Sequence, residues 1–258
     1  MDAIVTAGGV PTPEDPLYEY TRGAPKALLE VGGKPMVQWV LDAISNSQTV
    51  SQVVLVGLMA DSGLTCAKPL TFVPSHESML LNVRAGVEKV IEMDSGSHHI
   101  LVVSSDIPSI TTEMVDWLVN NTQQSDHDIY YTVVTREVME GRFPTSHRSY
   151  TRLKDVEVCG GDMNVIRAIT VTANEQLWEK IITARKNVLK QAALIGYGTL
   201  VLLLLRRLEL GSGIKRVCQR LGITGRVVFS PYAEIAMDVD KPHQLEILRA
   251  DLSSKVLA

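Results

Sequence analysis

The chain has 258 residues, 45% of them hydrophobic and 21% charged, which is the composition of an ordinary globular protein. Its net charge of −4 excludes the overall positive field that nonspecific nucleic-acid binding requires, so no nucleic-acid partner is expected. The three cysteines form no CxxC or Cys/His cluster, which argues against a zinc site and a disulfide framework. The N-terminus lacks the basic and apolar regions of a signal peptide, and a cytoplasmic location is predicted.

Strands and helices alternate along the first half of the chain. Apolar, β-rich runs predict strands at 3–7, 52–57, 100–104 and 129–134, and apolar residues at helical spacing predict helices at 35–45, 79–93 and 112–121. This alternation is typical of βαβ units. We therefore expect an α/β fold with a Rossmann-like, mostly parallel mixed sheet flanked by helices.

The second half of the chain is less regular. The predicted elements are a polar loop at 136–148, a strand at 164–171, a helical block at 174–220, a strand at 226–230 and a closing helix after Pro242. The sequence shows neither repeats nor a low-complexity linker. One domain over residues 1–258 is therefore expected.

One apolar run, AALIGYGTLVLLLL at 192–205, bears on whether the chain enters a membrane. A spanning helix needs about 20 residues, so this run is too short and no transmembrane segment is expected. We interpret it as a buried helix. Contact with a partner or a second copy through the helix near Leu200, and contact with a membrane surface, are the alternatives.

The residues that follow each predicted strand are the first candidates for a site, because ligands of open α/β sheets bind beyond the carboxyl ends of the strands. The first strand runs into Ala7, Gly8 and Gly9, and glycines there let backbone N–H groups approach an anion closely. Arg22 and Lys26 follow and bring positive charge suited to a triphosphate. A Gly-Gly pair also fits an ordinary turn, and the spacing matches neither GxxxxGK[ST] nor GxGxxG.

Carboxylates occur at two further positions, near opposite ends of the chain. Asp106 comes directly after an apolar strand and is followed by Ile107 and Pro108. Asp238 and Asp240, at i and i+2 of an extended segment, point the same way. Oxygen ligands of this kind suit Mg²⁺, which keeps several waters and bridges to substrate phosphates.

Three segments resemble the nucleotidyltransferase superfamily with a GT-A-like, Rossmann-like fold. They are AIVTAGG with TRGAPKALLEVGGKPMVQWVLDAI near the start, LVVSSDIP at 101–108, and the late segment MDVDKPHQL at 237–245. The superfamily includes sugar-1-phosphate nucleotidyltransferases, cytidylyltransferases, and the molybdenum-cofactor and adenosylcobinamide-phosphate guanylyltransferases. The AGG opening, SSDIP and the GGDMNV segment are most similar to the last two, the cofactor guanylyltransferases.

The resemblance implies roles for individual residues. Ala7, Gly8, Gly9, Arg22 and Lys26 would hold the NTP phosphates, with Lys26, Arg22 and Asp106 as the catalytic residues. Asp106 would hold Mg²⁺ or Mn²⁺ together with Asp238 or Asp240, and which of these two is the ligand stays open. Arg22 lies 13 positions after Gly9, farther than in the superfamily, and the inserted segment at 10–21 is either a lid or a decorated loop.

The base and acceptor sites are expected in two other segments. Ser75 and Asn82 lie in the region that contacts base and ribose in the superfamily, with His76 and Glu77 as candidates for reading the base, although Ser75 also fits the cap of the following helix. By the same resemblance Gly161, Asp162 and Asn164 would line the acceptor site. A basic loop suits a phosphorylated acceptor but also fits a solvated face, and its residues are Arg142, His147, Arg148, Arg152 and Lys154.

Together these features predict a Mg²⁺-dependent nucleotidyltransferase. It would transfer an NMP moiety from an NTP, with GTP or CTP favoured, to a phosphorylated small-molecule acceptor and release pyrophosphate. Residues 1–134 would form the NTP-binding half and 135–258 the acceptor-binding half, with extra helices at about 174–220. The alternatives are a glycosyltransferase that uses Asp238 and Asp240 as a nucleotide-sugar metal motif, and a non-catalytic nucleotide-binding regulatory protein.

Overall fold

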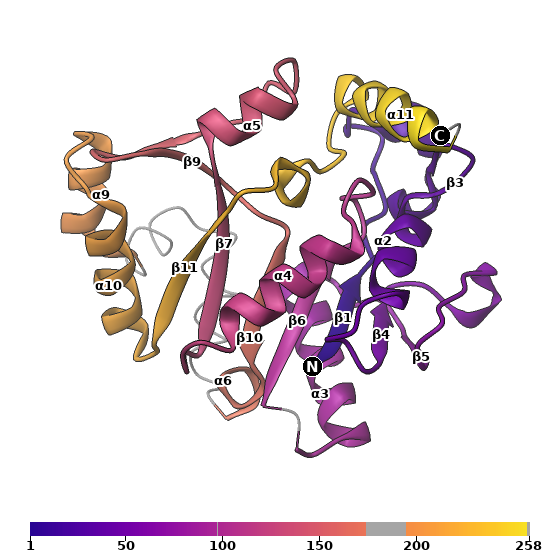
Figure 1. Ribbon diagram of the computed structural model, residues 1–258, viewed down its shortest axis with the longest axis horizontal. Helices are drawn as coiled ribbons and strands as arrows, with labels where there is room; N and C mark the ends of the chain where they lie inside the picture. Colours follow the sequence, from indigo (N-terminus) through magenta and orange to yellow (C-terminus); the bar gives the residue numbers. More distant parts are fainter. Residues whose placement is uncertain (97, 174–194, 257–258) are drawn as a thin grey trace.

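The computed structural model describes residues 1–96, 98–173 and 195–256, and one nine-stranded sheet runs through them (Figure 1). The strand order is β5-β4-β1-β6-β10-β7-β9-β8, with β11 paired to β7. The strands are β1 (Asp2–Thr6), β4 (Val53–Val56), β5 (Leu70–Val73), β6 (His99–Ser104), β7 (Ile129–Thr135), β8 (Thr151–Arg152), β9 (Glu157–Gly160), β10 (Met163–Arg167) and β11 (Gly225–Ser230). Seven of them run in one direction and β9 and β10 in the other, which confirms a mostly parallel mixed sheet.

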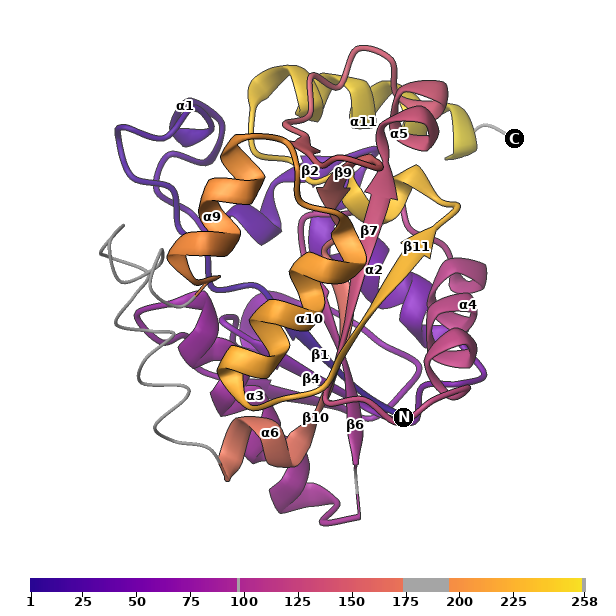
Figure 2. The same ribbon diagram turned by 90° about the vertical axis from the view of Figure 1, so that its left-hand side faces the viewer.

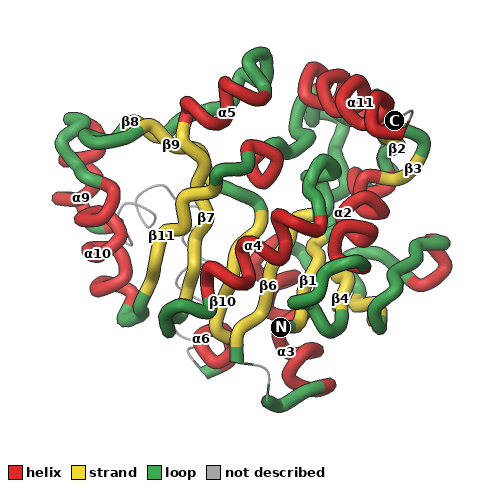
Figure 3. The backbone as a smooth tube through the Cα atoms, viewed as in Figure 1, coloured by secondary structure: helices red, strands yellow, loops and turns green. Residues whose placement is uncertain are grey.

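Helices cover both faces of this sheet, as Figures 1 and 3 show. The α-helices are α1 (Tyr18–Thr21), α2 (Met36–Ser45), α3 (Met79–Met93), α4 (Thr112–Thr122), α5 (Arg136–Arg142), α6 (Ala168–Thr172), α9 (Tyr197–Leu204), α10 (Leu210–Leu221) and α11 (Pro242–Val256). Short 3-10 helices lie at η1 (Lys26–Leu28), η2 (Ala60–Ser62) and η3 (Ala233–Ala236), and β2 (Glu30–Val31) and β3 (Lys34–Pro35) form a separate hairpin.

The alternation of side chains along β1 explains why helices pack on both faces of the sheet. Ala3 and Val5 pack in the cluster that contains α2 and α4, whereas Ile4 packs on the opposite face with Val83 and Val87 of α3. Because successive residues of a strand point to opposite faces, a fully apolar strand can hold helices on both sides. The continuous apolar run at the start of the chain therefore forms a strand, as predicted, and this strand lies inside the sheet between β4 and β6.

Most of the predicted elements agree with the structure, and three do not. The polar loop expected at 136–148 contains α5, whose N-cap Thr135 accepts a hydrogen bond from the backbone of Val138 at 3.3 Å. The strand expected at 164–171 ends at Arg167 and continues as α6. Of the helical block expected at 174–220, residues 174–194 lie outside the described residues, and the rest forms α9 and α10.

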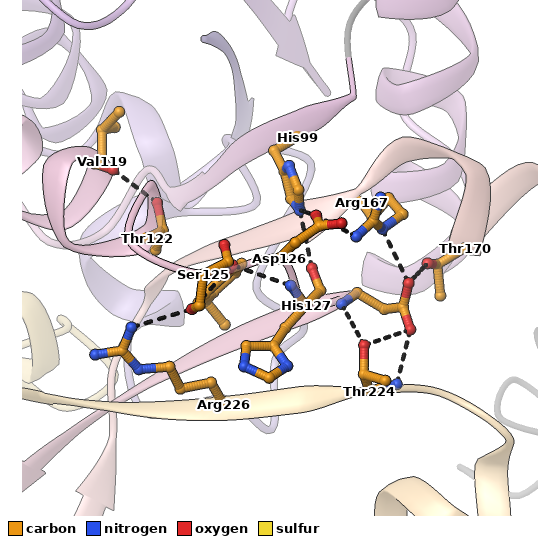
Figure 4. Close-up of polar contacts among 12 residues, drawn as sticks. His99, Val119, Thr122, Ser125, Asp126, His127, Arg167, Thr170, Thr224 and Arg226 are labelled. Atoms are coloured by element: carbon orange, nitrogen blue, oxygen red, sulfur yellow. Dashed lines mark hydrogen bonds and ion pairs between the residues drawn. The ribbon is translucent and has the colours of Figure 1, made fainter.

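A polar network joins strands at the edge of the sheet where β6, β7 and β11 begin (Figure 4). Arg167 forms an ion pair with Asp126 and a second with Asp128 at 3.0 Å, and Asp128 accepts hydrogen bonds from the backbone and side chain of Thr224 at 2.7 and 2.8 Å. His99 and the backbone oxygen of His127 are 2.8 Å apart. These bonds fix β11 beside β7 at the edge away from the candidate site.

None of the helices in the described part of the chain is both long and apolar enough to cross a membrane. The described part of the apolar run forms α9, which has 8 residues. The buried helix predicted for this run is only partly right, because one side of α9 is exposed to solvent.

Candidate active site

Polar residues from both ends of the chain meet at the edge of the sheet where β1 and β6 end. A cavity of about 570 Å³ lies there, between the loop after β1, the start of α3 and the end of β6. Its lining includes Gly8, Gly9, Lys26, Asn82 and Asp106. The expectation that candidate residues gather beyond the strand ends therefore agrees with where these five residues lie.

The glycine loop after β1 is shaped by close contacts. A Cβ atom on Gly8 would lie 2.4 Å from Ser75 Oγ and 2.7 Å from Asn82 Nδ2, so only glycine fits the observed packing. Asn82 is buried on α3 and accepts a hydrogen bond from the backbone of His76 at 2.6 Å. Nothing lies within 4 Å of a Cβ built on Gly9, which faces the cavity.

Lys26 is held at the mouth of this cavity by its backbone and by two carboxylates. Its backbone N–H donates to the oxygen of Gly9 at 2.9 Å, and the neighbouring Ala27 is buried. Its Nζ lies 2.6 Å from Asp106 Oδ2 and 2.7 Å from Asp240 Oδ1. Burial by itself lowers the pKa of Lys26, but the two carboxylates outweigh burial and hold this pKa above its usual value. The amine is therefore a fixed positive charge.

Three carboxylates come together beside Lys26. Oxygen atoms of Asp106, Asp238 and Asp240 lie within 4.8 Å of one another. A backbone hydrogen bond holds the segment of Asp238 and Asp240 next to Asp106. The N–H of Val239 donates to the backbone oxygen of Asp106 at 3.0 Å. The Asp240 carboxylate faces Lys26 rather than capping α11, since Gln244 accepts from the backbone of Asp240 and Lys241 instead.

Arg148 adds a second positive charge to this carboxylate set. Its guanidinium pairs with Asp238, and both side chains are largely buried. The Nε atom of Arg148 is buried and has no hydrogen-bond partner among the described residues. Arg148 also lines a polar cavity of about 530 Å³ with His147, Tyr150 and Arg152. Arg148 is therefore the residue through which the basic loop contacts the carboxylate cluster, by its ion pair with Asp238.

Asp162 lies close to the same charges from the start of β10. Its backbone N–H donates to Ile235 at 2.8 Å, and its backbone oxygen accepts from Ser104 at 2.8 Å. Its Oδ2 is buried without a hydrogen-bond partner among the described residues. Burial, and next the negative charge of Asp106, raise the pKa of Asp162 to about 7.

The donor set fits a hard divalent cation. All three clustered side chains offer carboxylate oxygens, and these are the ligands that Mg²⁺ takes in proteins. In this structure Lys26 and Arg148 balance the negative charge of the three carboxylates. An acidic cluster next to a 570 Å³ cavity with a glycine-rich edge is suited to a nucleoside triphosphate and its metal ion.

Comparison with known proteins identifies the family of this chain. Residues 3–223 match the model of the MobA-like NTP transferase domain. This chain belongs to the MobA-like NTP transferase family. It is a nucleotidyltransferase, and the superfamily expected from the sequence is confirmed.

Solved structures agree with this family. A hypothetical transferase from Thermus thermophilus is 31% identical, with a TM-score of 0.79 over 95% of this chain and 98% of that one. CMP:2-keto-3-deoxy-manno-octonic acid synthetase complexed with CTP is 15% identical, with a TM-score of 0.58 and 98% of each chain covered. The 2-C-methyl-D-erythritol 4-phosphate cytidylyltransferase, also from Thermus thermophilus, is 16% identical, with a TM-score of 0.53, and covers 98% of this chain and 99% of that one. The last two show the fold alone, and no curated protein sequence matched the chain.

Not every residue expected in the site of this NTP transferase lies in it. Arg22 is exposed at the end of α1 and is not among the described residues that line the 570 Å³ cavity. Asn164 uses its amide within the sheet, where it accepts from Thr132 at 2.8 Å and donates to Gly161 at 3.0 Å. Both assignments stay predictions, with Asn164 better suited to shaping the sheet than to contacting a ligand.

Three further expected residues, Ala7, Ser75 and Gly161, are not among the described residues that line the 570 Å³ cavity. Ala7 is buried and donates to Val56 at 2.7 Å, which anchors the loop after β1. Ser75 does not cap the following helix, since Ser78 accepts from Leu81 at 3.3 Å in that role. Gly161 packs against Ile235, where a Cβ would lie 3.0 Å from Ile235 Cγ2.

Two contacts of the site were not predicted from the sequence. Ser104 donates to Asp106 Oδ1 at 2.5 Å and fixes its carboxylate, and Arg148 pairs with Asp238. The sequence did offer a signal for the contact of Ser104, because Ser104 ends a strand two residues before Asp106. The second had no local signal, because Arg148 and Asp238 are 90 positions apart in sequence.

Proposed function

We propose that this nucleotidyltransferase transfers an NMP moiety from an NTP to a phosphorylated small-molecule acceptor and releases pyrophosphate, with Mg²⁺ or Mn²⁺ bound by Asp106, Asp238 and Asp240. The observation that carries the proposal is the position of Lys26, 2.6 Å from Asp106 and 2.7 Å from Asp240, at the mouth of a cavity edged by Gly8 and Gly9. This arrangement puts a fixed cation and a metal-binding carboxylate set beside backbone suited to phosphates.

Each group has a part in an in-line displacement at the α-phosphorus. Lys26 and the Gly8-Gly9 backbone neutralise the triphosphate and the leaving pyrophosphate. Asp106, Asp238 and Asp240 would hold the divalent ion, which would supply positive charge that offsets the repulsion between the two anionic reactants and stabilises charge on the phosphoryl oxygens. An acceptor phosphate is already anionic near neutral pH, so the site needs no general base.

The acceptor approaches from the side of β10 and the basic loop, within the 135–258 half. Arg148 lies between the 530 Å³ polar cavity and Asp238, which suits it to an anionic acceptor. Asp162 adds a carboxylate oxygen that has no hydrogen-bond partner in the described part of the chain, which suits it to an acceptor hydroxyl. His76, Glu77 and Asn82, at the other end of the site, are the residues proposed to meet the base, with GTP or CTP as the nucleotide.

The proposal is tested by incubating the enzyme and Mg²⁺ with each NTP and a fractionated pool of phosphorylated metabolites. We expect pyrophosphate release that needs one NTP and one fraction, with a product that mass spectrometry identifies as a nucleotide joined to the acceptor through a diphosphate. Asp106→Asn should lower the rate by about 100-fold or more, because a ligand and its charge are lost. Asp61→Asn, a matched change at an exposed carboxylate of η2, should leave the rate unchanged.

Two results would contradict this function. One is transfer of a sugar from a nucleotide-sugar with no pyrophosphate released, which would favour a glycosyltransferase. The other is near-normal turnover in Asp106→Asn, which would remove this carboxylate from the metal site.

A further inference from the structure

The helix α9 has two apolar sides, and among the described residues only one of them packs against the rest of the protein. Tyr197, Val201, Leu204 and Leu205 are exposed by 58%, 52%, 73% and 59%. Their spacing of i, i+4, i+7 and i+8 puts them on one stripe of the helix. On the opposite side, Thr199 and Leu203 line an apolar cavity of about 410 Å³ between the helix and the sheet. The exposed stripe is therefore a surface left over after the helix has packed.

The next helix, α10, is apolar inward and basic outward. Ile214, Val217 and Leu221 face the same 410 Å³ cavity, whereas Lys215 and Arg216 are exposed. A Cβ on Gly196 would lie 3.5 Å from Arg220 Cδ, so the end of α10 lies beside the start of α9. We call residues 196–221 the α9–α10 hairpin, and Figure 2 shows it on the outside of the molecule.

Charge sets the α9–α10 hairpin apart from the rest of the chain. It contains five basic residues, Arg206, Arg207, Lys215, Arg216 and Arg220, and a single carboxylate, Glu209, for a net charge of +4. Because the whole chain has a net charge of −4, all other residues together carry −8. Glu209 is engaged with Lys154, which ties the hairpin to the loop before β9. The hairpin therefore combines exposed apolar side chains on α9 with exposed basic side chains on α10 and in the turn between the two helices.

Neither feature is explained by nucleotidyl transfer, since none of the hairpin residues lines the 570 Å³ cavity or pairs with its carboxylates among the described contacts. A stripe of Tyr, Val and Leu flanked by Arg and Lys is the composition of helices that lie in the interface of a bilayer with anionic lipids. A helix of 8 residues is about 12 Å long and cannot cross a hydrocarbon core of about 30 Å. The hairpin can rest on a membrane without spanning it.

We propose that the α9–α10 hairpin docks this enzyme on an anionic lipid bilayer. The exposed stripe of α9 enters the boundary between headgroups and acyl chains, and Arg206, Arg207, Lys215 and Arg216 contact the anionic headgroups. The charge of −8 on the remaining residues directs the molecule to approach with this face first. Docking is independent of the nucleotide site and is measured without nucleotide.

Vesicle co-sedimentation of the full chain tests the proposal. With vesicles of phosphatidylcholine and about one-third phosphatidylglycerol at low salt, we expect binding that falls at about 0.5 M salt and is absent with phosphatidylcholine alone. Leu204→Ser and Arg207→Glu should each lower the vesicle-binding constant by about tenfold. Both side chains are exposed, and circular dichroism should show that the variants fold.

Matched changes elsewhere serve as controls. Met59→Ser alters a side chain that is 56% exposed near η2, and Arg249→Glu makes the same charge change on α11, so neither should alter vesicle binding. Absence of binding to the anionic vesicles, or equal binding by Leu204→Ser and the wild type, would overturn the proposal. A dimer in solution that dissociates on Leu204→Ser, with no vesicle binding, would also overturn it and assign the face to a second copy.

Discussion

Charge compensation governs the individual residues of the site. Lys26 bridges Asp106 and Asp240, and Arg148 pairs with Asp238, so these three carboxylates each have a cation. Asp162 differs, because its Oδ2 atom is buried with no hydrogen-bond partner among the described residues and its pKa is raised to about 7. In the folded protein this carboxyl group therefore binds its proton more tightly than an ordinary aspartate, whose value is 3.8.

This raised pKa predicts how stability depends on pH. Because the folded state holds the proton up to about pH 7 and the unfolded state releases it near 3.8, the contribution of Asp162 to stability is lost as pH rises between these values. Asp162→Asn removes the effect. Between about pH 5 and pH 8 the variant should gain roughly 2–3 kcal/mol relative to the wild type.

Urea denaturation of both proteins with a metal chelator, at several pH values, measures this difference. Asp61→Asn changes an exposed carboxylate and should track the wild type at every pH. A stability difference between Asp162→Asn and the wild type that stays constant with pH would show that Asp162 ionises normally.

At the level of elements, local patterns predicted the first half of the chain well. The helix expected at 79–93 has these bounds in the structure, because apolar spacing is local, but its cap is Ser78 rather than Ser75. The short strands β5, β8 and β9 escaped prediction, since β5 is stabilised by pairing with β4, and β8 and β9 by pairing with each other and β7, rather than by an alternating pattern. The helix α5 was missed because its seven residues are mostly polar and carry no apolar repeat.

The glycine loop after β1 gives a prediction at this scale. In Gly8→Ala the new methyl group meets Ser75 and the buried Asn82, so Asn82 must move and its bond with His76 is strained. We expect the free energy of unfolding to fall by about 1–3 kcal/mol. Gly9→Ala is the control, since its methyl group meets nothing within 4 Å, and it should change stability by no more than about 0.5 kcal/mol.

Chemical denaturation of the two variants without ligand separates packing from any effect on nucleotide binding. Equal losses of stability in Gly8→Ala and Gly9→Ala would mean that close packing around Gly8 does not position the loop.

At the scale of the whole molecule, the site exists because the fold unites the two ends of the chain. Asp106 and the segment of Asp238 and Asp240 were expected to share a metal from resemblance, and their oxygens lie within 4.8 Å of one another. The bond from Val239 to Asp106 that joins the segments could not be predicted, because it depends on the path of η3 across the sheet. The same holds for the outward position of Arg22 and the pairing of Arg148 with Asp238.

We propose above all that this edge of the sheet binds an NTP together with a divalent ion. Thermal unfolding of the wild type with CTP, GTP, UTP or ATP, each with and without Mg²⁺, tests it most directly. A ligand at about 100 times its dissociation constant adds ~2.7 kcal/mol, which raises the midpoint by roughly 5–10 °C at this chain length. We expect such a shift for one NTP, only with Mg²⁺, and its loss in Asp106→Asn. Absence of a shift with every NTP, or an equal shift in Asp106→Asn, would contradict it.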